Sequence, residues 1–107
     1  MQLVSYFKRR YPQAIMFHIP NQGISGIKGK IYGAKMKKMG LVAGVPDLFI
    51  AHPGKHDKRG LFIEMKSPRG KVSQKQKDVI NYLGMYYDKA VCYSYEQAVD
   101  TVDEYMG

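Results

Sequence analysis

The spacing of apolar residues along the chain predicts alternating helices and strands. Apolar positions recur at helical spacing near the amino terminus until Pro12 ends the run, which predicts a first helix over residues 3–11. The same spacing returns later and predicts helices over residues 74–87 and 96–106. Short apolar runs rich in β-branched and aromatic residues predict four strands, over residues 14–19, 45–51, 61–66 and 89–95.

A glycine-rich segment lies between the first two predicted strands. Its glycines recur at positions 23, 26, 29 and 33, but neither the GxGxxG nor the GxxxxGK[ST] order is present, so it is not a nucleotide-binding fingerprint. The segment predicts a mobile basic loop followed by a short helix over residues 34–39. The whole order predicts an α/β fold with a mixed four-stranded sheet flanked by helices, in one domain over residues 1–107.

Composition narrows the class of protein. Apolar residues make up 45% of the chain and charged residues 24%, which is typical of a soluble globular protein. No apolar run approaches the roughly 20 residues of a membrane-spanning helix, and the start has no signal-peptide pattern. The single cysteine, Cys92, excludes an internal disulfide and a cysteine-based zinc site. We therefore expect a cytoplasmic protein without membrane association.

The charge of the chain is distributed unevenly. Its formal net charge is +8, yet no acidic residue precedes Asp47, so the eight Lys and Arg residues within positions 1–46 account for all of that excess. A one-sided cationic field predicts a polyanionic partner such as nucleic acid. Solubility alone and binding to a membrane surface are alternative interpretations. However, solubility does not require such segregation, and a membrane surface favours a strongly amphipathic basic helix.

The third predicted strand carries two charged residues in an otherwise apolar stretch. Because side chains alternate between the faces of a strand, Glu64 and Lys66 share a face with Phe62. Burying both charges is costly unless they pair with each other or hold a metal ion. Asp47 begins another apolar strand directly after Pro46. Two carboxylates on adjacent strands would suit Mg²⁺ or Mn²⁺, and Lys66 would position a water molecule, deprotonate it or stabilise charge on a phosphate.

The sequence around these side chains resembles a known group of nucleases. PDLFI followed by IEMK matches the PD-(D/E)xK pattern of the restriction-endonuclease-like nucleases, with Asp47, Glu64 and Lys66 in the three named places. The K-x-S-x-x-Q run that follows, with Lys71 and Gln76 at its ends, is similar to that of the VRR-NUC (virus-type replication-repair nuclease) family. This resemblance covers nearly the whole chain.

The resemblance implies a restriction-endonuclease-like core and a metal-dependent DNA endonuclease. Stand-alone members from phage and bacteria act as homodimers on branched DNA, such as four-way (Holliday) junctions, or on supercoiled DNA. We therefore expect an intracellular bacterial or phage-infected setting. Asp47, Glu64 and the main-chain carbonyl of Met65 would hold the metal, Lys66 would serve the water, and Gln76 would join the catalytic residues. The expected DNA contacts are Asn21, Lys28, Lys30, Lys35, Lys37, Lys38, Arg69 and Lys71.

One departure and several simpler interpretations remain open. Members of the family generally supply a further acid from the first helix, where this chain has none before Asp47 and Gln2 is the nearest polar candidate. A non-catalytic nucleic-acid-binding module on a nuclease fold is therefore the alternative function. Asp47 alone fits a strand-entry residue, and Ser73 with Gln76 fits a capping box that is compatible with a catalytic role. The simpler alternative for Glu64 and Lys66 is a surface ion pair on an edge strand. The tyrosines at positions 82, 86 and 87 are interpreted as core or dimer interface.

Overall fold

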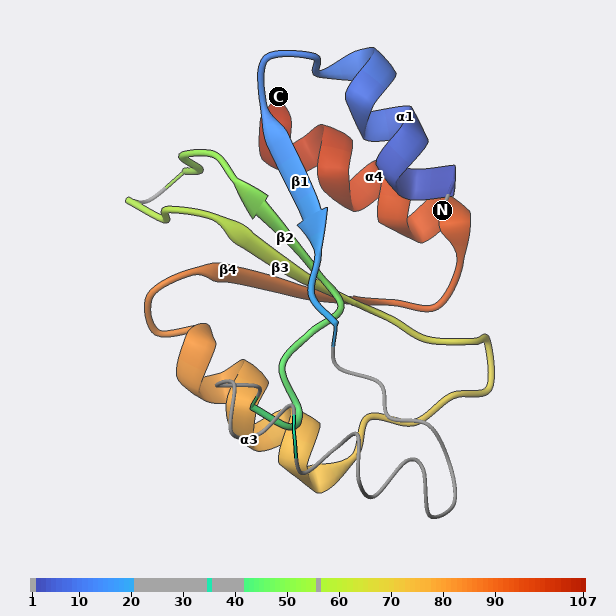
Figure 1. The fold of residues 1–107 in the computed structure, drawn as a ribbon, viewed down its shortest axis with the longest axis vertical. Coiled ribbons are helices and arrows are strands. Elements are labelled where there is room, and N and C mark those ends of the chain that lie inside the picture. The colour runs from blue at the N-terminus through green and yellow to red at the C-terminus, as the bar shows by residue number, and fades with distance from the viewer. Residues whose placement is uncertain (1, 21–34, 36–41, 56) are drawn as a thin grey trace.

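A computed structural model describes residues 2–20, 35, 42–55 and 57–107, and Figure 1 shows their arrangement. The remaining residues include Asn21, Lys28, Lys30, Lys37 and Lys38, so those expected DNA contacts lie outside the described residues, as does most of the predicted 34–39 helix. The described elements follow the predicted order. They are α1 (Gln2–Arg10), β1 (Ile15–His18), β2 (Leu48–Ala51), β3 (Leu61–Met65), α3 (Gln74–Leu83), β4 (Asp88–Cys92) and α4 (Tyr95–Met106).

The four strands form one mixed sheet in the order β1-β2-β3-β4. β1 and β3 both pair with β2 in the antiparallel sense, whereas β4 pairs with β3 in the parallel sense after the chain has passed through α3. Leu48 lies opposite Ile63, and Phe49 lies opposite Phe62. The mixed four-stranded sheet flanked by helices is confirmed, and it is compatible with a restriction-endonuclease-like core.

Helices cover both faces of the sheet, as Figure 1 shows, with α1 and α4 on one side and α3 on the other. The main apolar core lies under α1 and α4, because alternate residues of β2 and β3 point to that side. Its members are buried and come from these two helices and all four strands, namely Leu3, Phe7, Met16, Leu48, Ile50, Leu61, Ile63, Cys92, Ala98 and Val102. Within the described chain, no helix has the length and apolar character that crossing a bilayer requires.

Polar contacts fasten α1 to α4 above this core. The hydroxyls of Tyr6 and Tyr11 donate hydrogen bonds to the carboxylate of Asp103, at 2.8 Å and 2.6 Å. The hydrogen bond to Asp103 raises the pKa of Tyr11 to about 12, because it favours the protonated phenol. The two helices that cover this face are thus joined by side-chain contacts as well as by apolar packing.

The structure moves several predicted boundaries for identifiable reasons. The helix predicted over residues 74–87 ends at Leu83, because Gly84 caps it and the chain then turns. The last helix begins one residue earlier than predicted, since Ser94 is its N-cap and accepts a hydrogen bond from the backbone N–H of Gln97. Tyr87 therefore lies outside the helix. Tyr82 and Tyr86 are 60% and 57% exposed, so of their two interpretations the core is wrong, while the dimer interface stays a prediction.

Candidate active site

The register of the sheet brings Asp47 and Glu64 to the same place. Because Leu48 lies opposite Ile63, the preceding Asp47 faces the following Glu64 across the antiparallel pair. One hydrogen bond links this start of β2 to the end of β3, from the backbone N–H of Met65 to Oδ2 of Asp47 at 3.2 Å. Both carboxylates lie on the face of the sheet that α3 covers. The structure thus joins two acids that are 17 positions apart in the sequence.

Glycine and proline shape the approach of the chain to Asp47. Gly44 has a positive φ of 88°, a conformation that side-chain-bearing residues rarely adopt. A Cβ atom there would lie 2.9 Å from the carbonyl oxygen of Lys75, so the segment before Asp47 passes against the first turn of α3. Pro46 follows and is fully buried. The close approach of this segment to α3 therefore depends on Gly44, three residues before Asp47.

Glu64 is the most deeply buried charged residue in the part of the molecule that the structure describes. It is only 3% exposed, and Asp47 is 9% exposed. Burial raises the pKa of Glu64 above its ordinary value, and the neighbouring Asp47 carboxylate raises it further, while Lys66 partly opposes both effects. The ion pair between Lys66 Nζ and Glu64 Oε2 measures 3.3 Å. The alternative of a surface ion pair on an edge strand is wrong, because Glu64 is buried on a strand with neighbours on both sides.

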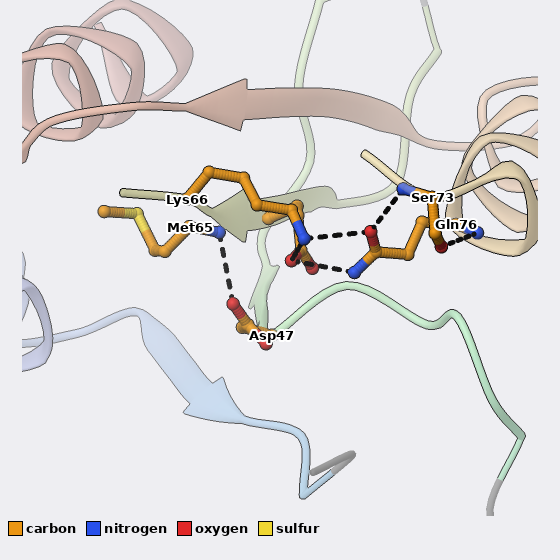
Figure 2. Close-up of polar contacts among 6 residues, drawn as sticks. Asp47, Met65, Lys66, Ser73 and Gln76 are labelled. Carbon is orange, nitrogen blue, oxygen red and sulfur yellow. Dashed lines mark hydrogen bonds and ion pairs between the residues drawn. The ribbon is translucent and has the colours of Figure 1, made fainter. Parts of the chain in front are cut away.

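Gln76 bridges the two charged groups, as Figure 2 shows. Its Oε1 accepts a hydrogen bond from Lys66 Nζ at 2.9 Å, and its Nε2 donates to Glu64 Oε2 at 3.1 Å. The same Oε1 accepts a second hydrogen bond from the backbone N–H of Ser73 at 2.9 Å. The Lys66 ammonium and the Ser73 N–H can donate hydrogen bonds but cannot accept them, so both must face the amide oxygen of Gln76. The NH₂ group of the amide therefore faces Glu64.

The amide of Gln76 is held in place by the first turn of α3. Ser73 is the N-cap of the helix, and its Oγ accepts a hydrogen bond from the backbone N–H of Gln76 at 3.1 Å. The reciprocal contact from Ser73 N–H completes a capping box. The sequence predicts this box and the proximity of Gln76 to the site, and the two roles share one side chain. The sequence did not predict that the cap also sets the orientation of the Gln76 amide. The S-x-x-Q spacing is the only feature of the sequence that indicates this arrangement.

The side chains present fit a hard divalent cation. Glu64 Oε1 is buried and has no hydrogen-bond partner in the part of the chain that the structure describes, a costly state for a carboxylate oxygen that a bound cation would relieve. The second carboxylate, Asp47, lies opposite it, and oxygen ligands are those that Mg²⁺ and Mn²⁺ prefer. Across the described residues, no group of three or more His, Cys, Asp or Glu side chains is arranged to hold a metal. Two carboxylates suffice for Mg²⁺, which keeps several waters.

The other predicted site residues occupy the periphery. Arg69 and Lys71 are exposed in the connection between β3 and α3, next to the capping box, and Lys35 is also exposed. Gln2, the nearest polar candidate in the first helix, lines a surface groove with Ser5, Arg9 and Tyr95. Gln2 makes no hydrogen bond to the carboxylates described above, so the structure does not place it in the third acidic position.

One comparison with known proteins shows the family, and another shows the fold. The model of the VRR-NUC domain matches residues 3–96 of the chain. A solved structure described as a VRR_NUC domain protein superposes with a TM-score of 0.75 at 24% sequence identity. That alignment covers 98% of this chain and 82% of the other. No curated protein matches the chain. At this identity the structural similarity establishes the fold, whereas the family assignment comes from the domain match.

Proposed function

The chain belongs to the VRR-NUC domain family, and from this premise we propose that it is a metal-dependent endonuclease that hydrolyses phosphodiester bonds of DNA. The observation that carries the proposal is Glu64 Oε1, a buried carboxylate oxygen with no hydrogen-bond partner among the described residues, next to a second carboxylate and a lysine. A purely structural ion pair gives no reason for an unpartnered oxygen at this position. An ion-binding site does.

The metal ligands of the proposal come from two adjacent strands. Asp47 from the start of β2 and Glu64 from β3 would hold Mg²⁺ or Mn²⁺, with the main-chain carbonyl of Met65 as a further oxygen ligand. When bound, such an ion polarises a phosphate oxygen and lowers the pKa of a coordinated water. The hydrogen bond from Met65 N–H to Asp47 Oδ2 keeps the two strands in register at this point.

Lys66 has a role that follows from its hydrogen bonds. Its ammonium group carries three N–H donors, of which one is directed to Gln76 Oε1 and one to Glu64 Oε2. The remaining donor is available to a phosphate oxygen or to the attacking water. Because the ammonium is paired with a buried carboxylate, we assign Lys66 to the stabilisation of negative charge on the phosphate rather than to proton abstraction. Gln76 positions both charged groups.

DNA contacts in this proposal surround the site. Arg69 and Lys71 lie exposed between β3 and the N-terminus of α3, where a phosphate is favoured by both their charge and the helix dipole. Lys35 and the basic residues outside the described part would extend this grip on the backbone. Such binding weakens steeply as salt concentration rises, because each phosphate contact releases counterions.

We further propose that the protein acts as a homodimer on branched DNA. A domain of 107 residues covers little DNA, whereas two copies related by a two-fold axis present two active sites to a two-fold substrate such as a four-way junction. Nicking of supercoiled DNA by the same site is the other substrate preference that the family resemblance implies. The two differ in the geometry of the DNA and not in the chemistry.

The first test compares a labelled four-way junction with a linear duplex of matching sequence, in Mn²⁺. The wild type and the Asp47→Ala variant are assayed together with Asp100→Ala, which removes an exposed acid of α4. The proposal expects cleavage by the wild type and by Asp100→Ala, and none by Asp47→Ala. Cleavage of the junction alone supports selectivity for branched DNA. Cleavage of both substrates supports the nuclease activity and contradicts the selectivity.

Calorimetric titration with Mn²⁺ separates the nuclease from the alternative function. A non-catalytic DNA-binding module, which the lack of a third acid at the site favours, would bind DNA without carboxylate-dependent metal binding. The nuclease proposal requires that Asp47→Ala weaken Mn²⁺ binding relative to the wild type. DNA binding that is unaffected by this variant, with no heat of Mn²⁺ binding in the wild type, would support the binding module.

A further inference from the structure

A second surface with distinctive chemistry lies at the end of α3 opposite to Gln76. The turn between β2 and β3 and the chain that follows α3 enclose a groove of about 700 Å³. Both segments lie on the same side of the molecule in Figure 1. We call it the tyrosine groove, and its lining residues are Asp57, Lys58, Arg59, Tyr82, Leu83, Met85, Tyr86 and Tyr87.

Large apolar side chains are unusually exposed in the tyrosine groove. Tyr82, Met85 and Tyr86 are 60%, 61% and 57% exposed, and they are adjacent rather than scattered. The rings of Tyr82 and Tyr86 pack edge to face, with centroids 5.8 Å apart. This contact fixes each ring relative to the other while more than half of each side chain stays open. Two ordered aromatic rings on a surface form a platform for planar ligands.

The base of the groove is packed against the sheet. Tyr87 packs edge-on against Phe49 and Phe62 of the sheet, with ring centroids 5.7 Å and 5.3 Å apart. Phe49 and Phe62 also pack against each other. The exposed tyrosines therefore stand beside an aromatic cluster that is anchored in β2 and β3. The groove is part of the folded structure and does not need to form when a ligand binds.

The charges of the groove are mostly positive, and only some have a structural role. Lys58 Nζ donates to the carbonyl oxygen of Gly84 at 3.3 Å, so it stabilises the negative end of the α3 dipole. Arg59 is exposed and makes no hydrogen bond or ion pair with any described residue. Asp57 is the one carboxylate among the lining residues. Among the described residues, the Arg59 guanidinium has no polar partner, and it lines the same groove as the exposed rings.

We propose that the tyrosine groove binds unpaired nucleotides of the DNA substrate, with bases stacked on Tyr82 and Tyr86 and a phosphate contacted by Arg59. Every base has a π-face that stacks on a tyrosine ring, but only unpaired bases expose it. The inference rests on the proposed nuclease function for its substrate. α3 has ten residues and so extends about 15 Å, or roughly four nucleotide steps of duplex DNA, from the site to the groove.

A second copy of this chain fits the groove less well. A two-fold contact through this surface would bring Lys58 and Arg59 of both copies into one interface, and Asp57 is the only carboxylate among the lining residues of each copy, so repulsion between like charges would exceed the attraction. A nucleic acid strand supplies planar groups that stack on the rings of the groove and negative charge that complements its excess of positive side chains. The groove would give the enzyme a preference for branched, gapped or tailed DNA over continuous duplex.

The test measures binding by fluorescence anisotropy in EDTA, so that no cleavage occurs. A short blunt duplex is compared with the same duplex carrying an unpaired thymidine tail. The wild type should bind the tailed DNA more tightly, and the double variant Tyr82→Ser, Tyr86→Ser should lose roughly tenfold in affinity for it while duplex binding stays unchanged. Tyr82→Phe with Tyr86→Phe should retain the preference, because the rings remain. Arg59→Gln should lower the slope of log affinity against log salt by about one.

Two controls distinguish base stacking in the groove from a general effect of losing tyrosines and from contact between copies. Tyr95→Ser removes a tyrosine that is 37% exposed on α4, on the other side of the sheet, and should change nothing. Equal binding of both DNAs by the wild type, or an unchanged preference in the double serine variant, would overturn the proposal. A double variant that shifts from dimer to monomer in analytical ultracentrifugation would reassign the groove to contact between copies. Because binding is measured without metal, a failure of the nuclease function leaves this result intact.

Discussion

The two faces of β2 and β3 are built from alternate residues and differ completely in character. Toward α1 and α4 the strands present Leu48, Ile50 and Ile63, all with no exposed surface. Toward α3 they present aromatic rings in the middle and the carboxylates of Asp47 and Glu64 at one end. The first face closes off an apolar core, whereas the second face holds buried charge whose hydrogen bonds are incomplete.

This difference shows how one short strand serves stability and chemistry together. Ile63 and Glu64 are neighbours in the chain, yet their side chains point to opposite faces because a strand has a period of two. A buried apolar side chain is stabilised by its surroundings, while a buried carboxylate near another is destabilised by them. Substitutions one position apart should therefore have opposite consequences.

The largest effect is expected at Glu64. Glu64→Gln keeps the size of the side chain and removes the charge that the proposed metal requires. Metal stabilisation of a phosphate is worth several kcal/mol, so cleavage should fall by about a thousandfold or more. The measurement is the rate of DNA cleavage in Mn²⁺ at saturating protein. A variant that cleaves within a few-fold of the wild type would exclude Glu64 as a metal ligand.

Ile63→Ala tests the opposite face. Removal of this fully buried side chain leaves a cavity among the residues of the core and should lower the free energy of unfolding by roughly 2–5 kcal/mol. Urea unfolding followed by circular dichroism measures the loss. The cleavage rate of the protein that remains folded should be close to that of the wild type. A cleavage rate as low as that of Glu64→Gln would mean that the core face contributes to cleavage as well as to stability.

Much of the fold was predictable, because it depends on local patterns. The helical spacing of α1, α3 and α4 and the apolar runs of the strands give their order and their approximate bounds. The predicted range of α3 was too long, because the apolar pattern continues through Tyr87 although the backbone stops being helical at Gly84. The sequence also did not indicate that β1 lies at the edge of the sheet. Phe17 is 46% exposed in a strand whose composition resembles that of a central one.

The candidate site was predictable in its members and not in its contacts. Asp47, Glu64 and Lys66 are recognisable because charged residues interrupt apolar strands, and the spacing of Ser73 and Gln76 indicates a cap. The unpartnered Glu64 Oε1 depends on how three elements meet, which no spacing records. The same holds for the tyrosine groove, since its turn and its helix are brought together only by the fold.

Gln76 allows the contribution of positioning to be separated from that of helix capping. Gln76→Ala removes the bridge between Lys66 and Glu64 as well as half of the capping box. Groups that orient a metal site typically contribute a factor of 10–100 to activity, and we expect a loss of about that size. The free energy of unfolding should fall by about 1 kcal/mol from the cap.

The chain offers a matched control in Gln97. This residue occupies the same position in α4, where Ser94 Oγ accepts a hydrogen bond from its backbone N–H and its Oε1 accepts one from Tyr93 N–H at 2.8 Å. Gln97 belongs to α4, which covers the face of the sheet opposite to α3. Gln97→Ala should therefore lower stability through the weakened helix N-terminus without the loss of cleavage. Equal cleavage by the two variants would reduce Gln76 to a capping residue.

The smallest expected effect is the pH dependence that Glu64 gives to stability. Its pKa is raised in the folded protein, so the folded state holds the proton more tightly than the unfolded chain does. The free energy of unfolding of the wild type should therefore fall as pH rises from the ordinary glutamate value through the raised one. Glu64→Gln cannot titrate, and all other groups are common to both proteins.

The difference in stability between Glu64→Gln and the wild type should then move in favour of the variant across that range, in EDTA. Urea unfolding at a series of pH values measures it. Addition of Mg²⁺ at neutral pH should reverse the trend for the wild type alone, because a cation bound only to the folded state stabilises it. A difference that stays constant with pH would mean that the carboxylate is as well solvated in the fold as in the unfolded chain. Such a result would contradict the buried, incompletely paired carboxylate that distinguishes this face of the sheet from the other.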